Sequence, residues 1–219
     1  MIMSALIMIR VLGFCFAALL ALAAPAQAHP HVWVTMEIEL VYGQDGRVTG
    51  LKHAWTFDDM FSEYATQGIT PKVKGQFTRD ELKPLAEENV SSLKEYAFFN
   101  FLKADGKAIK DVIADPTDYW LDYKNEMLVL NFTLPLKQPV KAKDLQIEIY
   151  DPEFFVNFTF GEKSPVKLTG APDKCNLTTK QPGEDQFPSS QRLDKSFQES
   201  NANSGMGAAY ASKIFVKCP

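Results

Sequence analysis

The sequence has few of the residues and motifs from which common catalytic sites are built. Its 219 residues include three histidines and three cysteines, and no two cysteines have the C-x-x-C spacing of zinc and redox sites. It contains no G-x-S-x-G nucleophile motif and no glycine-rich phosphate loop. The formal charge of −4 argues against nonspecific nucleic-acid binding, which requires a basic surface. We therefore expect neither an enzyme nor a nucleic-acid partner.

Long hydrophobic runs are absent except at the amino terminus. Residues 1–28 contain Arg10, an apolar run that ends near Ala24, and an A-x-A site that ends at Ala28. This order is typical of a secretory signal peptide cleaved after Ala28. The alternatives are an uncleaved membrane anchor, for which the apolar run is short, and a lipoprotein signal at Cys15, where the preceding residue is bulky.

Cleavage after Ala28 would leave 191 residues with a formal charge of −5, because Arg10 leaves with the signal. No other stretch approaches transmembrane length, so we expect the processed chain to be soluble. Two cysteines, Cys175 and Cys218, would remain in an oxidising compartment, where an even number of cysteines favours a disulfide. Metal ligation by the same pair is the alternative.

The processed chain opens with a predicted β-hairpin. Residues 31–42 and 47–57 are rich in β-branched and aromatic residues that alternate with polar ones. A four-residue turn between them would place Glu37 opposite Lys52, a favourable cross-strand ion pair. The same register would bring His31 near Asp58.

The remaining pattern predicts an α+β fold with a mainly antiparallel sheet, two early helices and one disulfide. Residues 29–180 are interpreted as a single domain, and residues 181–219 as a polar surface loop and a final strand that Cys218 ties back. The expected helices cover residues 58–67, with a cap at Asp58 or Asp59, and a segment that starts with a capping box at Thr78 and Glu81. The other expected elements are strands at 96–102, 108–113, 117–123, 126–134, 145–150, 153–160, 166–168 and 208–218, and a short helix near 193–197.

All three histidines fall in the first hairpin. Cleavage after Ala28 would make His29 the amino-terminal residue, so that its amine and imidazole could chelate one metal ion together. His31 or His53 could add a nitrogen ligand, and Asp58 an oxygen ligand. The alternative is that the histidines are incidental, with His53 a hydrogen-bonded core residue opposite Met36.

Several segments together resemble one family. These segments are HPHVWV, HAWTFDDMFS, FFNFLKADGK, LNFTLPL and YDPEFFVNF with a later cysteine. They are similar to the bacterial exported family of unknown function DUF1007, whose members are often described as periplasmic components of an uncharacterised ABC-type transport system. The resemblance implies a periplasmic location, no established enzymatic activity, and proximity to nickel/cobalt-type transporters.

Three functional hypotheses follow. The first is a periplasmic accessory protein of a transition-metal transport system, which binds Ni, Co, Zn or Cu through His29, His31, His53 and Asp58 and serves an inner-membrane metal transporter. The second is a noncatalytic protein-interaction module with structural histidines, which docks through exposed aromatics such as Phe154 or Phe155. The third, a copper oxidase or oxygenase that uses a His29 brace, has the least support.

Overall fold

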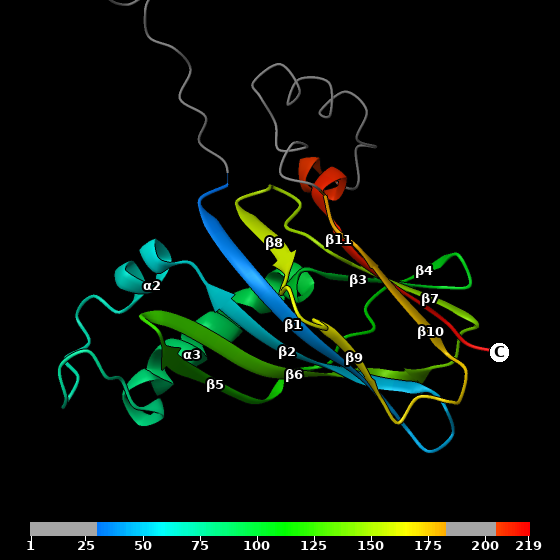
Figure 1. The fold of residues 1–219 in the computed structure, drawn as a ribbon, viewed down its shortest axis with the longest axis horizontal. Coiled ribbons are helices and arrows are strands. Elements are labelled where there is room, and N and C mark those ends of the chain that lie inside the picture. The colour runs from blue at the N-terminus through cyan, green and yellow to red at the C-terminus, as the bar shows by residue number, and fades with distance from the viewer. Residues whose placement is uncertain (1–29, 183–204) are drawn as a thin grey trace, which may run out of the picture.

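The computed structural model describes residues 30–182 and 205–219, which form two β-sheets with two α-helices at one side (Figure 1). The first sheet has the order β5-β6-β2-β1-β8, with β9 also paired to β1, and the second has the order β10-β11-β7-β3-β4. The predicted α+β class, with mainly antiparallel pairing, two early helices and one disulfide, is confirmed. The strands are β1 (Val32–Tyr42), β2 (Val48–Phe57), β3 (Asn100–Ala104), β4 (Lys107–Ile109), β5 (Thr117–Lys124), β6 (Met127–Val140), β7 (Asp144–Ile149), β8 (Val156–Phe160), β9 (Val166–Thr169), β10 (Asn176–Lys180) and β11 (Ser212–Lys217).

The first hairpin forms as predicted, but its register differs by two residues. Lys52 stands opposite Glu39, with the Lys52 Nζ and Glu39 Oε1 atoms 3.3 Å apart, so the predicted pairing with Glu37 is wrong. The cause is the turn, which closes with a hydrogen bond from the N–H of Gly43 to the carbonyl of Arg47 and follows a β-bulge. Because the shift is an even number, every side chain keeps its predicted face.

Strand β1 lies in the interior of the first sheet. It pairs with β2 in the antiparallel sense on one side and with β8 and β9 in the parallel sense on the other. Parallel neighbours require long crossover connections, and here the helices and the intervening strands supply that length before β8. The chain around β1 is therefore held from both sides, which fixes the position of the first described residues.

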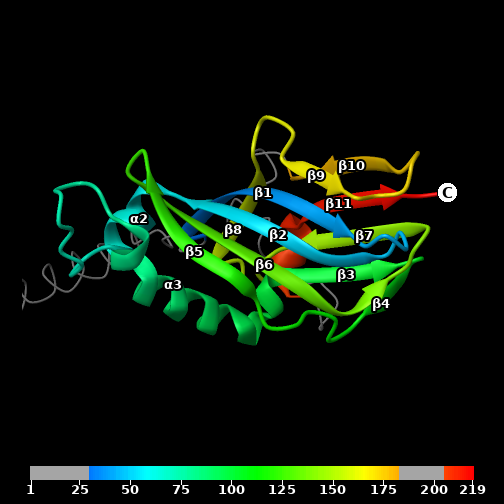
Figure 2. The same ribbon diagram turned by 90° about the horizontal axis from the view of Figure 1, so that it is seen from below.

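The two helices are α2 (Asp59–Ala65) and α3 (Arg79–Leu93). Helix α3 starts with the predicted capping box, in which the Thr78 side chain accepts from the N–H of Glu81 and the Glu81 carboxylate accepts from the N–H of Thr78. Its buried residues recur every four positions and form one face, which packs against β5 (Figure 2). These buried residues are Leu82, Ala86 and Val90.

A tight turn replaces part of a predicted strand after α3. Residues 94–99 form the 3₁₀ segment η1 (Lys94–Phe99), and β3 begins only at Asn100, so the predicted start of this strand at Tyr96 is wrong. Three consecutive residues, Ala97, Phe98 and Phe99, have φ values of 48°, 51° and 56°. This left-handed backbone cannot continue a strand, and it turns both phenylalanine rings into the interior, where they are buried.

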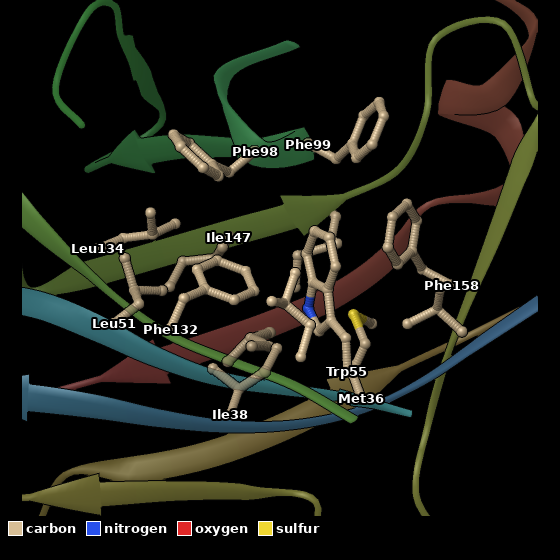
Figure 3. Close-up of a cluster of buried hydrophobic side chains, with 14 of the residues drawn as sticks. Met36, Ile38, Leu51, Trp55, Phe98, Phe99, Phe132, Leu134, Ile147 and Phe158 are labelled. Carbon is tan, nitrogen blue, oxygen red and sulfur yellow. The ribbon is translucent and has the colours of Figure 1, made fainter. Parts of the chain in front are cut away.

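The core lies between the two sheets (Figure 3). Trp55 sits at its centre, 1% exposed, and its ring centroid lies 4.8 Å from that of Phe132 and 4.9 Å from that of Phe158. Ile147 of the second sheet and Phe98 of η1 close the cluster from the opposite side. Aromatic rings therefore form the centre of the core, and aliphatic side chains from both sheets surround them.

The predicted disulfide between Cys175 and Cys218 is present, and it joins the segment before β10 to the residue after β11. The two cysteines therefore form a disulfide and do not act as a pair of metal ligands. Strand β11 confirms the predicted return of the chain within residues 208–218 as a strand, whereas the helix predicted near 193–197 and the signal segment lie outside the described residues. Within the described ranges, no helix has the length and apolarity needed to cross a bilayer.

Candidate functional site

His31 lies at the exposed entrance to β1. The backbone N–H of His31 donates to the backbone carbonyl of Phe155 at 2.8 Å. The imidazole of His31 lies against the Phe155 ring, with ring centroids 4.7 Å apart. The pairing explains why two successive phenylalanines follow the Asp151 turn. Phe154 has a φ of 57° and turns inward to stack on Tyr210, whereas Phe155 remains 46% exposed beside His31. His29, the residue on which the predicted chelate depends, lies outside the described residues.

Asp58 joins the start of β1 to helix α2. One carboxylate oxygen accepts from the backbone N–H of Phe61 at 2.8 Å and so caps α2. The other oxygen accepts from the backbone N–H of Trp33 at 2.7 Å. Asp58 contacts Trp33, which is two residues along the strand from His31. His31 therefore lies about 7 Å along the strand from the point that Asp58 contacts. The Asp58 carboxylate primarily has a structural role, although each oxygen retains a second lone pair.

His53 is a core residue. It stands opposite Ile38 rather than the predicted Met36, is 3% exposed, and packs flat against Phe132. Its Nδ1 accepts a hydrogen bond from Nε1 of Trp55 at 3.3 Å, which places the imidazole proton on Nε2. Burial lowers the pKa of His53 from its ordinary value of 6.5 to about 3, so the ring is neutral at physiological pH.

The structure does not bring the predicted ligands together. His53 faces Ile38, seven residues along the strand from His31, which separates the two imidazoles by about 23 Å at about 3.3 Å per residue. Across residues 30–182 and 205–219, no group of three or more His, Cys, Asp or Glu side chains has a geometry that could hold a metal ion. Of the four predicted ligands, His31 and Asp58 lie at one end of the first sheet, and His53 lies in the core.

A second candidate site, which the sequence did not indicate, lies on the outer face of the second sheet. Glu148 projects from β7 between Lys103 of β3 and Lys213 of β11, with oxygen–nitrogen distances of 3.0 Å and 3.2 Å, and it also accepts from Nε2 of Gln146 at 2.8 Å. Burial by itself would raise the pKa of the Glu148 carboxyl, but the hydrogen bonds and positive charges of the two lysines outweigh burial and hold the pKa below its ordinary value.

This cluster forms part of a cavity with strained walls. The cavity, of about 1130 Å³, is bounded by η1, β3, β7 and residues 108–115. Ala97 and Phe98 of the left-handed turn line it, and each such residue costs about 1–3 kcal/mol. Asn100 also lines the cavity. Its Nδ2 donates to the carbonyl of Phe98, and its buried Oδ1 has no hydrogen-bond partner among the described residues.

The comparisons with known proteins identify the family and nothing finer. The chain belongs to the family described as "Protein of unknown function (DUF1007)", whose model matches residues 14–218, and this confirms the resemblance of its sequence segments. An uncharacterized protein of Haemophilus influenzae is 25% identical over 198 residues, which cover 87% of this chain and 91% of that protein.

One similar solved structure is the acetylcholine-binding protein type 1 of Biomphalaria glabrata. It is 11% identical, with 95% of this chain and 97% of that chain covered and a TM-score of 0.32. The score is too low to support a shared fold.

Proposed function

We propose that the protein is a noncatalytic periplasmic accessory protein of a transition-metal transport system, and that the metal is held at the processed amino terminus. The donors are the amine and imidazole of His29 and the imidazole of His31, with the Asp58 carboxylate at the same end of the first sheet. The observation that carries the proposal is the position of His31, an exposed imidazole held at the entrance to β1 immediately after the segment that cleavage would expose. Nitrogen donors of this kind suit Ni, Co, Zn and Cu.

His53 has no part in this site. Its imidazole is enclosed by Trp55 and Phe132, and a metal ion could reach it only if the core opened. The revised ligand set therefore depends on the amino-terminal segment and not on the hairpin interior. This dependence makes the proposal testable by changing only the first residues of the mature chain.

Calorimetric titration with Ni²⁺, Co²⁺, Zn²⁺ and Cu²⁺ tests the proposal on protein whose first residue is verified as His29 by intact mass. Replacing His29 and His31 together by alanine should weaken binding by more than about 100-fold, since most of the donors are removed. Adding Gly-Ser before His29, which keeps every side chain and moves the amine away, should also weaken binding. His53→Gln should leave the affinity unchanged. Wild-type affinity in the extended protein would refute the terminal chelate.

A second candidate function has its own observation. Large apolar side chains are exposed near the start of β1, before β8 and on helix α2, with Trp33 47%, Phe155 46%, Met60 72% and Tyr64 72% exposed. Such a surface is typical of a protein-interaction site. Pull-down from membranes by the wild type and by Trp33→Ser and Phe155→Asp variants, with Tyr119→Ser on β5 as a matched control, tests it. An unchanged partner list in the first two variants counts against this function.

A further inference from the structure

The cavity beside Glu148 has the dimensions of a small-molecule site. Its volume of about 1130 Å³ is slightly above the range of about 300–1000 Å³ for ligand pockets. Four parts of the chain that are distant in sequence line it, namely residues 94–115, Lys137 of β6, the outer face of β7 with Tyr150, and residues 208–213. A pocket assembled in this way is shaped by the fold and is not a gap within one loop.

The charge of the cavity is opposite to that of the protein. Five lysines and three carboxylates line it, which gives a formal charge of +2 within a chain of −4. A positively charged hollow in an acidic protein attracts and retains anions. The lining residues of this kind are Lys94, Lys103, Lys110, Lys137 and Lys213, with Asp111, Asp115 and Glu148.

The lysines differ in how much of their charge is already compensated. Lys94 and Lys137 each pair with an exposed aspartate in the cavity wall. Lys103 and Lys213 share the single Glu148 carboxylate, so two positive charges meet one negative charge at the cavity wall. Lys110 is exposed and, within the described part of the chain, makes no ion pair. Lys103, Lys110 and Lys213 therefore carry the excess positive charge and retain N–H donors.

The rest of the wall is apolar and aromatic. Phe101 of β3 stacks on Tyr150 with ring centroids 4.3 Å apart. Ile109, Val112 and Ile113 also line the cavity, and they pack against the hydrophobic core. These side chains suit a hydrocarbon or aromatic body.

We propose that this cavity binds an amphipathic organic anion, with its acidic group at Lys103, Lys110 and Lys213 and its apolar body against Phe101 and Tyr150. Charge complementarity and the apolar wall together define this class of ligand, because an inorganic anion would leave the aromatic surface uncovered and a neutral hydrocarbon would leave the lysines without a partner. The N-terminal histidines take no part in this binding.

Fluorescence titration with two dyes of the same ring skeleton tests the proposal. The dye 8-anilinonaphthalene-1-sulfonate carries one sulfonate and an N–H group, and N-phenyl-1-naphthylamine lacks the sulfonate. We expect about one sulfonate dye to bind per folded chain, about tenfold or more tighter than the neutral dye, as expected for a charge-assisted contact. Equal affinities for the two dyes, or no saturable binding of the sulfonate, would overturn the proposal.

Variants locate the binding. Lys110→Glu should weaken binding of the sulfonate by about tenfold and leave the neutral dye unaffected, whereas the matched change Lys74→Glu, in the loop between α2 and α3, should leave both unaffected. Ala108→Trp, which fills the cavity from the exposed edge strand β4, should abolish binding of both dyes. Thermal melting verifies that each variant is folded. Equal effects of the Lys110 and Lys74 changes would overturn the proposal even if the tryptophan variant does not fold.

Discussion

The imidazole of His53 lies flat against the ring of Phe132, with ring centroids 4.8 Å apart and planes inclined by 11°. Protonation would place a positive charge in this aromatic enclosure, which explains why burial lowers the pKa of His53 to about 3. The pKa of this histidine is about 6.5 in the unfolded chain. Between about pH 6.5 and pH 3, the unfolded chain therefore binds a proton at His53 and the folded chain does not.

The free energy of unfolding should consequently fall as the pH decreases from 6.5. From this one group we expect a slope of about 0.7 kcal/mol per pH unit at pH 6.5 that rises to about 1.4 kcal/mol per pH unit near pH 5, because the unfolded state gains a proton and the folded state does not. Urea unfolding at half-unit pH intervals measures the slope. His31→Ala should retain it and His53→Gln, which keeps an acceptor for Trp55, should lose it. A flat profile in the wild type would contradict the neutral buried imidazole.

The disulfide between Cys175 and Cys218 should stabilise the fold by about 2–4 kcal/mol, since it closes a loop across a sequence separation of 43 residues. Cys175→Ser, Cys218→Ser and the double variant should all lose the same amount, because each removes the same bond. Urea unfolding with and without a thiol reductant provides the measurement. An additional loss in the double variant would show that the cysteines contribute separately.

Asp122 should matter more to stability than its partner Arg79. The Asp122 carboxylate is 13% exposed and accepts from Arg79 at 2.6 Å, from Trp120 at 3.0 Å and from Asn131 at 3.3 Å. Asp122→Asn should lower the free energy of unfolding by about 1–3 kcal/mol, because the amide loses the negative charge and replaces one of the two acceptor oxygens with an NH₂ donor that faces part-buried donors. Arg79 is 60% exposed, so Arg79→Ala should lower it by less than about 1 kcal/mol. Urea unfolding at pH 7 compares them, and equal losses would contradict this assignment.

Gly207 should not tolerate a side chain. A β-carbon there would overlap the carbonyl oxygen of Asp151, and the N–H of Gly207 donates to the carbonyl of Pro152 at 3.1 Å. Gly207→Ala should therefore separate segment η3 (Met206–Tyr210) from the turn before β8, with a loss of about 2 kcal/mol or more. Gly161→Ala, where a β-carbon meets only ordinary contacts, is the matched control. Thermal unfolding of the two variants measures the difference, and equal melting temperatures would contradict the contact.

Local signals in the sequence predicted local structure well. The alternation in residues 31–42 identified β1 and its buried face, and the capping box at Thr78 located the start of α3. The strands predicted at 96–102 and 108–113 overlap with β3 and β4, which form a hairpin. These features were predictable because the residues that determine them lie within a few positions of one another.

Long-range features could not be predicted in the same way. The hairpin register depended on a bulge, and the parallel pairing of β1 with β8 depended on the position of a strand more than a hundred residues further along. The Glu148 cluster combines β3, β7 and β11, and no spacing in the sequence indicates that Lys103 and Lys213 approach the same carboxylate. The grouping of the three histidines in one hairpin suggested a cluster, but strand geometry separates His31 from His53.

Strand β11, the last strand of the chain, lies inside the second sheet, between β10 and β7. A chain in which β11 has not yet paired therefore has two open strand edges, on β10 and on β7, and such edges are prone to mispairing with other chains. The second sheet is therefore continuous only once β11 has paired with both neighbours, and a chain cut before β11 would keep both edges open.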